Sequence, residues 1–485
     1  MESGTCVRIA SPLLVGTALM IALGCGGGQP GSSSPQPPPS SPATITVSGT
    51  PWGTSTQYIG ANEGDQYFNA ADIKDLGINT YRIYGSVARW EYQPDSGTVG
   101  SPTEAQIQAN PNVINWSWWD TVMTTPPGGS DYSWDGDTTV WQGNARTIFQ
   151  TLQQNGIRTV VVLRPVSPGG TPTWADQSMN PPSTTTGQNA WWEHVFALAY
   201  WLNVRNKYVV DDWEIENEPD NSTQGWSGSL SDYVSFSALT ANAINYVYST
   251  YLPGRTPHIY APVTTGSSTW PQSLMQQAPG SFDSVDIHDY DANISTYVST
   301  VHGSMSANGF TNSPLWVTEW STYAASQYEN ASFGVSDVIS NLILSSQPGS
   351  NYVYGSHIYS LYDWGSGAYG LMGPGDTPRA DYYAMRLAIR GLHGGRTTFQ
   401  TTCSVPGLMA ITTKDISGHY WVLIADTSSS ATSATVNLSS LISNGQGMMW
   451  QFDSSHNDVV VASPTLASGQ VTLSLSANTA FLLEF

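Results

Sequence analysis

The chain has 485 residues, and its 36 acidic against 15 basic residues give a formal net charge of −21. A chain this acidic repels phosphate backbones and shows no basic patch, which excludes nucleic acid as a partner. Hydrophobic residues at 40% and aromatic residues at 11% exclude a largely disordered protein. The longest apolar stretch, from Ile9 to Gly24, is too short to span a membrane. The length accommodates two to four domains of about 100–200 residues each, and one large barrel plus an accessory domain equally well.

The first 25 residues have the pattern of a bacterial export signal, in which Arg8 precedes an apolar run that ends in small residues. Gly24-Cys25 resembles a lipoprotein processing site, where Cys25 would be lipidated and become the first mature residue; ordinary signal cleavage is the alternative. Residues 26–43, rich in Gly, Pro, Gln and Ser, are interpreted as a linker. We therefore expect an exported protein, either held at the cell surface or outer membrane by a lipid anchor or secreted.

Through the middle of the chain, short β-branched or aromatic runs alternate with helical patterns, which is typical of βα repeats around a parallel sheet. Eight candidate strands can be counted, and eight closes a (β/α)8 TIM barrel of the α/β class. An open doubly wound sheet is the alternative, but no Gly-x-Gly-x-x-Gly motif follows the first strand. The candidate strands are Gln57–Ala61, Thr80–Tyr84, Arg158–Leu163, Trp213–Glu218, His258–Val263, Ser284–His288, Leu315–Glu319 and Tyr354–Ser360.

Between these strands, apolar residues recur at helical spacing, for example over residues 191–202 and 236–247. Gly77 and Gly156 each precede a strand and suit the C-terminal cap of a helix. We expect the last barrel helix from Asp381 to about Leu392 and assign residues 44–394 to the barrel.

Residues 395–485 are expected to form a C-terminal all-β sandwich domain, because short alternating strands replace the helical patterns there. The strand-like segment Ala43–Ser48 lies before the barrel but could cross over and join this domain, which would fix the two domains together. The expected strands are Met409–Thr413, Tyr420–Ala425, Ala434–Leu438, Met448–Phe452, Gln470–Leu475 and Thr479–Phe485.

Two of the candidate barrel strands end in glutamate. Glu218 closes the fourth strand in Asn-Glu-Pro, and Glu319 closes the seventh in Thr-Glu-Trp. Because barrel enzymes place their chemistry at the C-terminal ends of strands, and strands 4 and 7 lie across the lumen, both carboxylates can converge over one cavity. Paired carboxylates across a cleft are what cleavage of a glycosidic bond needs, one to protonate the leaving oxygen and one to meet the cationic sugar carbon.

These strand ends resemble the retaining (β/α)8 glycoside hydrolases of clan A, and the resemblance covers roughly residues 55–395. It leans toward family 39, which is β-xylosidase-like, and then toward families 30 and 5. The resemblance implies Glu218 as the acid/base and Glu319 as the nucleophile. It also implies that the substrate site includes Arg82 beside the nucleophile, Asn217 at the sugar 2-hydroxyl, His288 and Tyr290 at the end of strand 6, Trp320, and Trp364 at the floor of the −1 subsite.

Several of these residues have a structural alternative. Arg82 could pair with an inward glutamate such as Glu214, His288 could be an interior histidine, and Trp364 could belong to the core. In the insertion after the second strand, packing and distal sugar stacking are both open for Trp116, Trp118 and Trp119.

Two positions depart from the clan pattern. Glu216 replaces the usual Trp before Asn-Glu-Pro, and the strand 3 histidine common in several of these families is missing beside Arg164. Strand alternation predicts that Glu214, Glu216 and Glu218 all face the lumen. The first two then need cationic partners, for which Arg82 and Arg164 are the candidates.

The sequence therefore predicts a retaining glycoside hydrolase that cleaves β-glycosidic bonds of a neutral plant or microbial polysaccharide or oligosaccharide, of xylan, xyloside or glucan type. The alternative is a non-catalytic surface lipoprotein that binds glycans. No metal or other cofactor is expected, because the acidic residues of 211–220 fall on different faces without an accompanying histidine. The sequence leaves open the sugar and linkage, endo or exo action, and the oligomeric state.

Overall fold

The computed structural model describes residues 42–63, 68–91, 102–125, 144–165, 181–266, 268–290, 294–321, 325–363, 369–430 and 432–485. The predicted export signal, Cys25, nearly all of the predicted linker and Trp364 lie outside these residues. In the described part of the chain, no helix combines the length and the apolar character that a membrane crossing requires.

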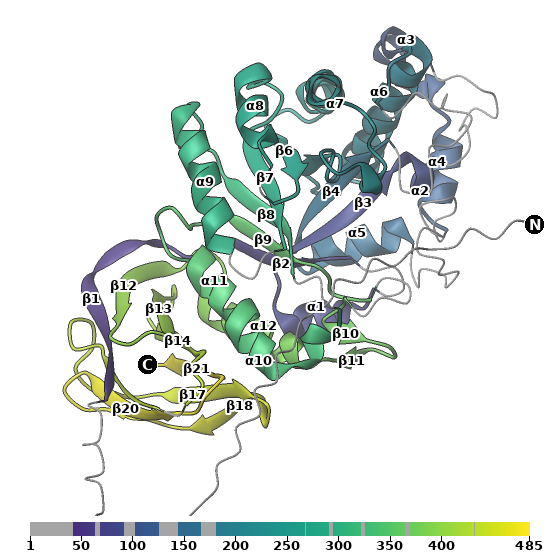
Figure 1. Cartoon of the computed structure of the whole chain (residues 1–485). Coiled ribbons are helices and arrows are strands. Elements are labelled where there is room, and N and C mark those ends of the chain that lie inside the picture. Colours follow the sequence, from purple (N-terminus) through teal and green to yellow (C-terminus); the bar gives the residue numbers. More distant parts are fainter. Residues whose placement is uncertain are drawn as a thin grey trace, which may run out of the picture. The chain divides into compact units, whose positions relative to one another are not determined.

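Eight parallel strands close into a barrel, as the sequence predicts (Figure 1). Each pairs with its neighbours in chain order, and β2 pairs with β9 to close the ring. The barrel strands are β2 (Tyr58–Asn62), β3 (Thr80–Ser86), β4 (Arg158–Arg164), β5 (Asp212–Ile215), β6 (His258–Thr264), β7 (Ser284–Asp289), β8 (Leu315–Trp320) and β9 (Gly355–Ile358).

The fourth barrel strand is shorter than predicted, because β5 ends at Ile215. Glu216 and Glu218 have positive φ angles of 66° and 48°, a left-handed conformation that strands do not adopt. The prediction that strand alternation turns three glutamates toward the lumen is therefore wrong beyond Glu214. A sharp bend after the strand, and not the strand itself, directs the other two side chains.

Helices connect the barrel strands, and the two with the clearest predicted periodicity are α6 (Thr185–Tyr200) and α7 (Leu230–Tyr251). Gly77 is the C-cap of α1 with φ of 80°, and Gly156 follows α5 with φ of 69°. The last barrel helix is α12 (Ala380–Leu392), as expected. The others are α1 (Ala70–Leu76), α2 (Val87–Trp90), α3 (Glu104–Ala109), α4 (Trp116–Val122), α5 (Ala145–Gln154), α8 (Trp270–Gln277), α9 (Ile294–Ala307), α10 (Ala331–Phe333), α11 (Ser340–Ser345), and the short η1 (Pro111–Val113), η4 (Trp201–Arg205), η5 (Ser222–Gln224), η6 (Ala325–Glu329) and η7 (Gly334–Ile339).

A curled, mostly antiparallel sheet of nine strands follows the barrel, in the order β18-β17-β21-β14-β13-β12-β1-β15-β20. The N-terminal strand β1 (Ala43–Thr54) lies in this sheet, antiparallel to β12 and parallel to β15, so the crossover hypothesis is confirmed. Figure 1 shows β1 in purple beside the green β12. The other strands are β12 (Thr397–Cys403), β13 (Leu408–Lys414), β14 (Tyr420–Asp426), β15 (Thr432–Asn437), β17 (Met448–Asp453), β18 (His456–Ala462), β20 (Gln470–Leu475) and β21 (Thr479–Glu484), with the short pairs β10 (Met372–Gly373) and β11 (Thr377–Pro378), and β16 (Gly445–Gln446) and β19 (Thr465–Leu466).

Two strands of the nine-stranded sheet, β12 and β18, are not among those that the sequence predicts. The sequence of β12 is dominated by Thr, and three consecutive valines of β18 are exposed at the edge of the sheet. Neither strand therefore has the alternation of buried and polar residues that marks a strand with one face in a core.

Aromatic side chains fill the barrel below the carboxylates. The Trp316 ring is fully buried and stacks on Tyr260 and Tyr58, with ring centroids 4.9 and 5.5 Å apart. In the insertion after β3, Trp116 and Trp119 are 9% and 0% exposed and belong to the main hydrophobic core. Packing is therefore the role that the structure supports for these two tryptophans.

Candidate active site

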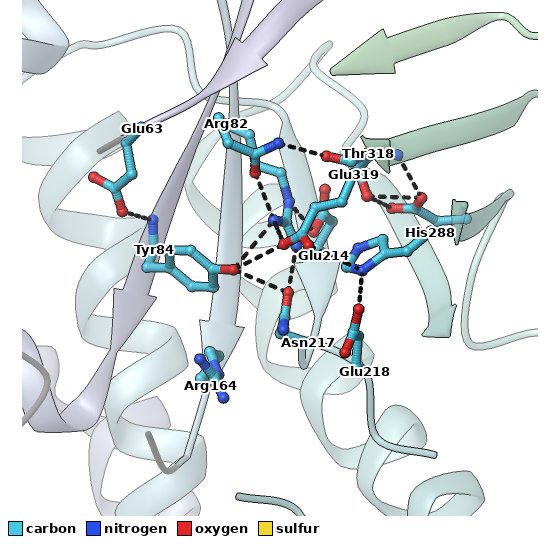
Figure 2. Close-up of polar contacts among 12 residues, drawn as sticks. Glu63, Arg82, Tyr84, Arg164, Glu214, Asn217, Glu218, His288, Thr318 and Glu319 are labelled. Atoms are coloured by element: carbon cyan, nitrogen blue, oxygen red, sulfur yellow. Dashed lines mark hydrogen bonds and ion pairs between the residues drawn. The ribbon is translucent and has the colours of Figure 1, made fainter. Parts of the chain in front are cut away.

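Glu218 and Glu319 meet at the C-terminal end of the barrel (Figure 2). Glu319 is the penultimate residue of β8, and Glu218 stands on the bend after β5. His288 of β7 lies between them, with Nδ1 2.9 Å from Glu218 Oε1 and 3.4 Å from Glu319 Oε2. One oxygen of each carboxylate and a ring nitrogen of the histidine lie within 4.8 Å of one another. The predicted pair is thus brought together.

The surroundings of Glu319 hold it in the ionised form. Arg82 Nη1 and Tyr84 Oη donate to Glu319 Oε1 at 2.6 and 3.0 Å. Tyr290 Oη donates to the other oxygen at 2.6 Å. Burial alone would raise the pKa of Glu319, but the nearby charges of His288 and Arg82 and the hydrogen bond from Tyr290 lower that pKa to about 2.

Glu218 has different neighbours. Its Oε1 faces His288, and its Oε2 accepts a hydrogen bond from Asn221 Nδ2 at 2.9 Å. Among the residues that the structure describes, no arginine forms an ion pair with Glu218. The two carboxylates therefore lie side by side but in unequal electrostatic environments, which is the condition for giving them separate roles.

Arg82 connects the site to the barrel interior and is fully buried. Its Nε donates to Glu214 Oε2 at 2.7 Å, and its Nη2 donates to Asn217 Oδ1 at 2.8 Å. Both interpretations of Arg82 therefore hold at once, since the same guanidinium pairs with an inward glutamate and with Glu319. Burial, opposed by the charge of Arg82, raises the pKa of Glu214.

Glu216, the residue that departs from the clan pattern, is also fully buried. Its Oε1 accepts from Arg164 Nε at 3.1 Å. Glu214 and Glu216 thus each face one of the two arginines that the sequence suggested: Glu214 faces Arg82, and Glu216 faces Arg164.

A cavity of about 270 Å³ opens over the two carboxylates. Of the predicted substrate residues, Asn217 and Tyr290 line it, while Arg82 and His288 are fully buried and touch the carboxylates. Trp320 is only 3% exposed and packs in the hydrophobic core, so the structure does not place it on the cavity. The lining residues are Tyr84, Asn217, Glu218, Asn221, Gln224, Thr265, Gly266, Tyr290, Glu319, Tyr359 and Tyr369.

Sequence reasoning missed several residues of the site. Tyr84 follows Arg82 by two positions on β3 and so shares its face, a signal that alternation along the strand could have supplied. Asn62, the last residue of β2, accepts from Arg82 Nη1 at 2.7 Å, and its position at a strand end was a weaker signal. Asn221 and Tyr369 lie in irregular segments, where no periodicity indicates the direction of a side chain.

Within the described residues, Glu218, His288 and Glu319 form a group whose ligand atoms are close enough to hold a metal ion. The donors around Glu319 argue for a different use of these atoms. Arg82 Nη1 lies 2.6 Å from Glu319 Oε1, and the positive charge of its guanidinium would repel a metal cation there. The other oxygen, Oε2, already accepts a hydrogen bond from Tyr290. The arrangement fits a hydrogen-bonded carboxylate pair better than a metal centre, where carboxylate oxygens turn their lone pairs to the ion.

Comparisons of the sequence and of the fold with known proteins find similarity to glycosyl hydrolases. Residues 217–347 match the family model of the glycosyl hydrolase catalytic core. No curated protein sequence matches the chain. Similar solved structures include a glucosidase from Croceicoccus marinus, with 13% identity and a TM-score of 0.62 over 91% of this chain and 98% of that one. A family 30 endoxylanase from Clostridium papyrosolvens has 14% identity and a TM-score of 0.62 over 91% and 99% of the two chains.

A family 39 enzyme from Xanthomonas axonopodis pv. citri has 14% identity and a TM-score of 0.61 over 93% of this chain and 99% of that chain. At such identities the likeness establishes the fold, and the catalytic-core match adds the carboxylate-bearing segment. Together they show a chain with the barrel-plus-sheet fold of these glycosidases and a segment that matches the glycosyl hydrolase catalytic core, similar to the clan A glycoside hydrolases as the sequence predicts.

Proposed function

We propose that the protein is a retaining β-glycosidase in which Glu319 is the nucleophile and Glu218 is the acid/base. One observation carries the proposal: the two carboxylates present oxygens within 4.8 Å of one another, and Arg82 pairs with Glu319. Retaining enzymes keep their carboxyl groups about 5–5.5 Å apart, whereas inverting enzymes separate them by about 6.5–9.5 Å to admit a water. The short separation supports double displacement.

In the first step Glu319 attacks the anomeric carbon while Glu218 gives its proton to the departing oxygen. The bond from carbon to the leaving oxygen breaks as the bond to Glu319 forms, which yields a covalent glycosyl-enzyme. In the second step Glu218 takes a proton from water, and the water oxygen displaces Glu319 from the sugar. Arg82, Tyr84 and Tyr290 would stabilise the negative charge that Glu319 carries before the attack and regains at release.

We infer that the substrate is a neutral β-linked polysaccharide or oligosaccharide of xylan, xyloside or glucan type. Amide and hydroxyl groups of Asn217, Asn221 and Thr265 line the cavity beside tyrosine rings, a combination that suits uncharged sugars. The net charge of −21 disfavours strongly anionic polysaccharides. The glucosidase and the endoxylanase among the structural neighbours support the same substrate class.

We also propose that the chain is exported and either held at the membrane by a lipid on Cys25 or secreted. The apolar run after Arg8 and the Gly24-Cys25 pair support export.

Replacing each carboxylate tests the assignment of roles. Glu319→Ala should abolish turnover of aryl β-glycosides, and azide should restore it as a glycosyl azide of inverted configuration, because azide enters through the space that Glu319 vacates. Glu218→Ala should still react with an activated aryl glycoside, accumulate the glycosyl-enzyme, and give a retained glycosyl azide. Mass spectrometry detects the intermediate, and NMR gives the configuration of the products.

Glu329→Ala is the matched control, since this glutamate has an exposed side chain and should keep full activity. Two results would contradict the assignment: turnover by Glu319→Ala without azide, or a first product of inverted configuration from the wild-type protein.

A further inference from the structure

Arg164, at the end of β4, contacts both ends of the segment that carries Glu218. Its Nε donates to Glu216 Oε1 at 3.1 Å, and its Nη2 donates to the backbone oxygen of Gln224 at 2.5 Å. The side chains of Arg164 and Glu216 are only 2% and 0% exposed. One buried guanidinium therefore closes residues 216–224 into a loop, and the proposed acid/base lies within it.

At the first end of this loop, the contact sets the direction of the backbone. Glu216 Oε1 accepts from the backbone N–H of Asn217 at 3.1 Å as well as from Arg164. Glu216 has a φ of 66°, a conformation that a residue other than glycine keeps only when its surroundings impose it. The ion pair with Arg164 holds the carboxylate that caps this turn.

At the second end, a short series of hydrogen bonds leads back to the carboxylate. The backbone N–H of Gln224 donates to Asn221 O, and that of Asn221 donates to Glu218 O, both at 2.9 Å. Asn221 Nδ2 then donates to Glu218 Oε2 at 2.9 Å. A displacement of Gln224 would thus be transmitted to the Oε2 atom of Glu218, which accepts from Asn221.

Arg164 also lies 5.4 Å from the centroid of the Tyr84 ring, and Arg82 lies 5.2 Å from the same centroid. Tyr84 contacts Glu319, so a second route leads from Arg164 toward the nucleophile. The two directional hydrogen bonds of Arg164 described above go to the loop, however, and the contact with Tyr84 is a cation–π contact, which constrains position less. The geometry favours the route to Glu218.

We propose that Arg164 is a positioning residue which, through Glu216 and Gln224, holds Glu218 in place for proton transfer. The proposal rests on the proposed function, because it takes Glu218 as the acid/base. One property of acid catalysis distinguishes this positioning role of Arg164 from a general structural role. A leaving group of high pKa needs the proton of Glu218 to depart, whereas a strongly acidic phenol departs without that proton.

The test compares wild type, Arg164→Lys and Glu216→Gln on aryl β-glycosides whose phenols have graded pKa values. Lysine keeps the positive charge but lacks the rigid, forked guanidinium that lets arginine donate to Glu216 and Gln224 at the same time. In both variants we expect kcat/KM to fall about 10- to 100-fold for the glycoside of the least acidic phenol. For the glycoside of the most acidic phenol, kcat/KM should stay within about threefold of the wild-type value. The plot of log kcat/KM against the phenol pKa therefore becomes steeper in both variants.

Arg158→Lys is the matched control. Arg158 begins the same strand, and its Nε donates to Asp212 Oδ2 at 2.6 Å near the opposite end of the barrel, so its replacement should leave the slope unchanged. An equal loss on every phenol in the Arg164 and Glu216 variants overturns the proposal in favour of the route through Tyr84 or of a general disturbance of the fold. If Arg164→Lys does not fold, Glu216→Gln, which preserves shape and an acceptor oxygen, decides. Wild-type protein that cleaves none of these glycosides overturns the proposed function and this inference together.

Discussion

Arg82 is the residue on which the charge of the site depends. Its guanidinium is fully buried and is shared between Glu214 and Glu319, so a single cation faces two carboxylates. A buried carboxylate without a partner would take up a proton instead of staying charged. Glu319 has additional hydrogen-bond donors, whereas burial raises the pKa of Glu214. Of the two carboxylates that Arg82 contacts, the arrangement therefore favours ionisation of Glu319, which lines the cavity.

Tyr290→Phe should shift the pH dependence of the reaction. The pKa of Glu319 is lowered to about 2, partly by the hydrogen bond from Tyr290. A hydrogen bond to a charged group is worth about 1.5–3 kcal/mol, so its loss should raise that pKa by about one to two pH units. Because kcat/KM reports the free enzyme, the acid limb of its pH profile should move upward by the same amount in the variant.

Tyr369→Phe is the control for this shift, since Tyr369 lines the same cavity but its ring packs near Tyr359. Its acid limb should match that of wild type even where kcat/KM falls. An unchanged acid limb in Tyr290→Phe would show that the hydrogen bond does not tune Glu319. The same lowered pKa also bears on stability: ionised Glu319 stabilises the fold above its ordinary pKa of 4.5, and this contribution is lost as the pH falls toward 2.

Among the elements, the bend after β5 matters most for the site. The backbone N–H of Glu216 donates to Leu163 O in β4, and that of Glu218 donates to Val263 O in β6, both at 2.9 Å. These bonds continue the barrel ladder on both sides although the chain has left the strand conformation. The bend can therefore turn Glu218 toward β7 without leaving backbone donors unpaired.

Gly355→Ala should destabilise the barrel beneath the site. A Cβ on this residue of β9 would lie 2.0 Å from the ring of Trp316, which is fully buried. Overpacking of this kind costs about 1–3 kcal/mol of unfolding free energy. Denaturant unfolding should show the loss.

Gly303→Ala in α9 is the matched control. A Cβ there meets no atom within 4 Å, and alanine in place of glycine inside a helix should raise stability by about 0.5–1 kcal/mol. Equal stability of Gly355→Ala and wild type would mean that the Trp316 ring moves freely, and that the aromatic floor is less rigid than its stacking implies.

In the molecule as a whole, Asp458 of β18 joins the C-terminal sheet to α12 of the barrel. It is 5% exposed and accepts from Arg386 Nε at 2.8 Å and from Arg390 Nη1 at 2.5 Å. Asp458→Asn suits the positive φ of 54° at this position and removes only the charge. We expect a loss of about 1.5–3 kcal/mol of unfolding free energy, with kcat and KM per folded molecule unchanged.

Asp453→Asn in β17 controls for this change, because its carboxylate contacts only nearby residues such as His456 and Gln451 among those described. It should affect thermal unfolding less than Asp458→Asn does. A change of kcat in Asp458→Asn as large as its change in stability would contradict a purely structural role for the ion pairs between sheet and helix.

Much of the fold and the proposed catalytic pair could be predicted because both depend on local patterns. Short apolar runs separated by helical periodicity predict the closed barrel, and strands form at all eight expected positions. Glutamates that end strands of a parallel barrel must gather at one end of it, so the sequence alone pairs Glu218 with Glu319. The polar β12 and the exposed edge strand β18 lack such a pattern and were missed.

The partners of the charged side chains could be narrowed from the sequence but were decided by the tertiary structure. Arg82 and Glu214 are 132 residues apart in the chain, and Arg164 and Glu216 are 52 apart. The left-handed bend at Glu216 is likewise imposed by neighbouring strands and not by residue type. Which glutamate lies against an arginine, and which against a histidine, follows from contacts that exist only once the barrel has closed, because buried charges are stabilised by whatever the fold brings beside them.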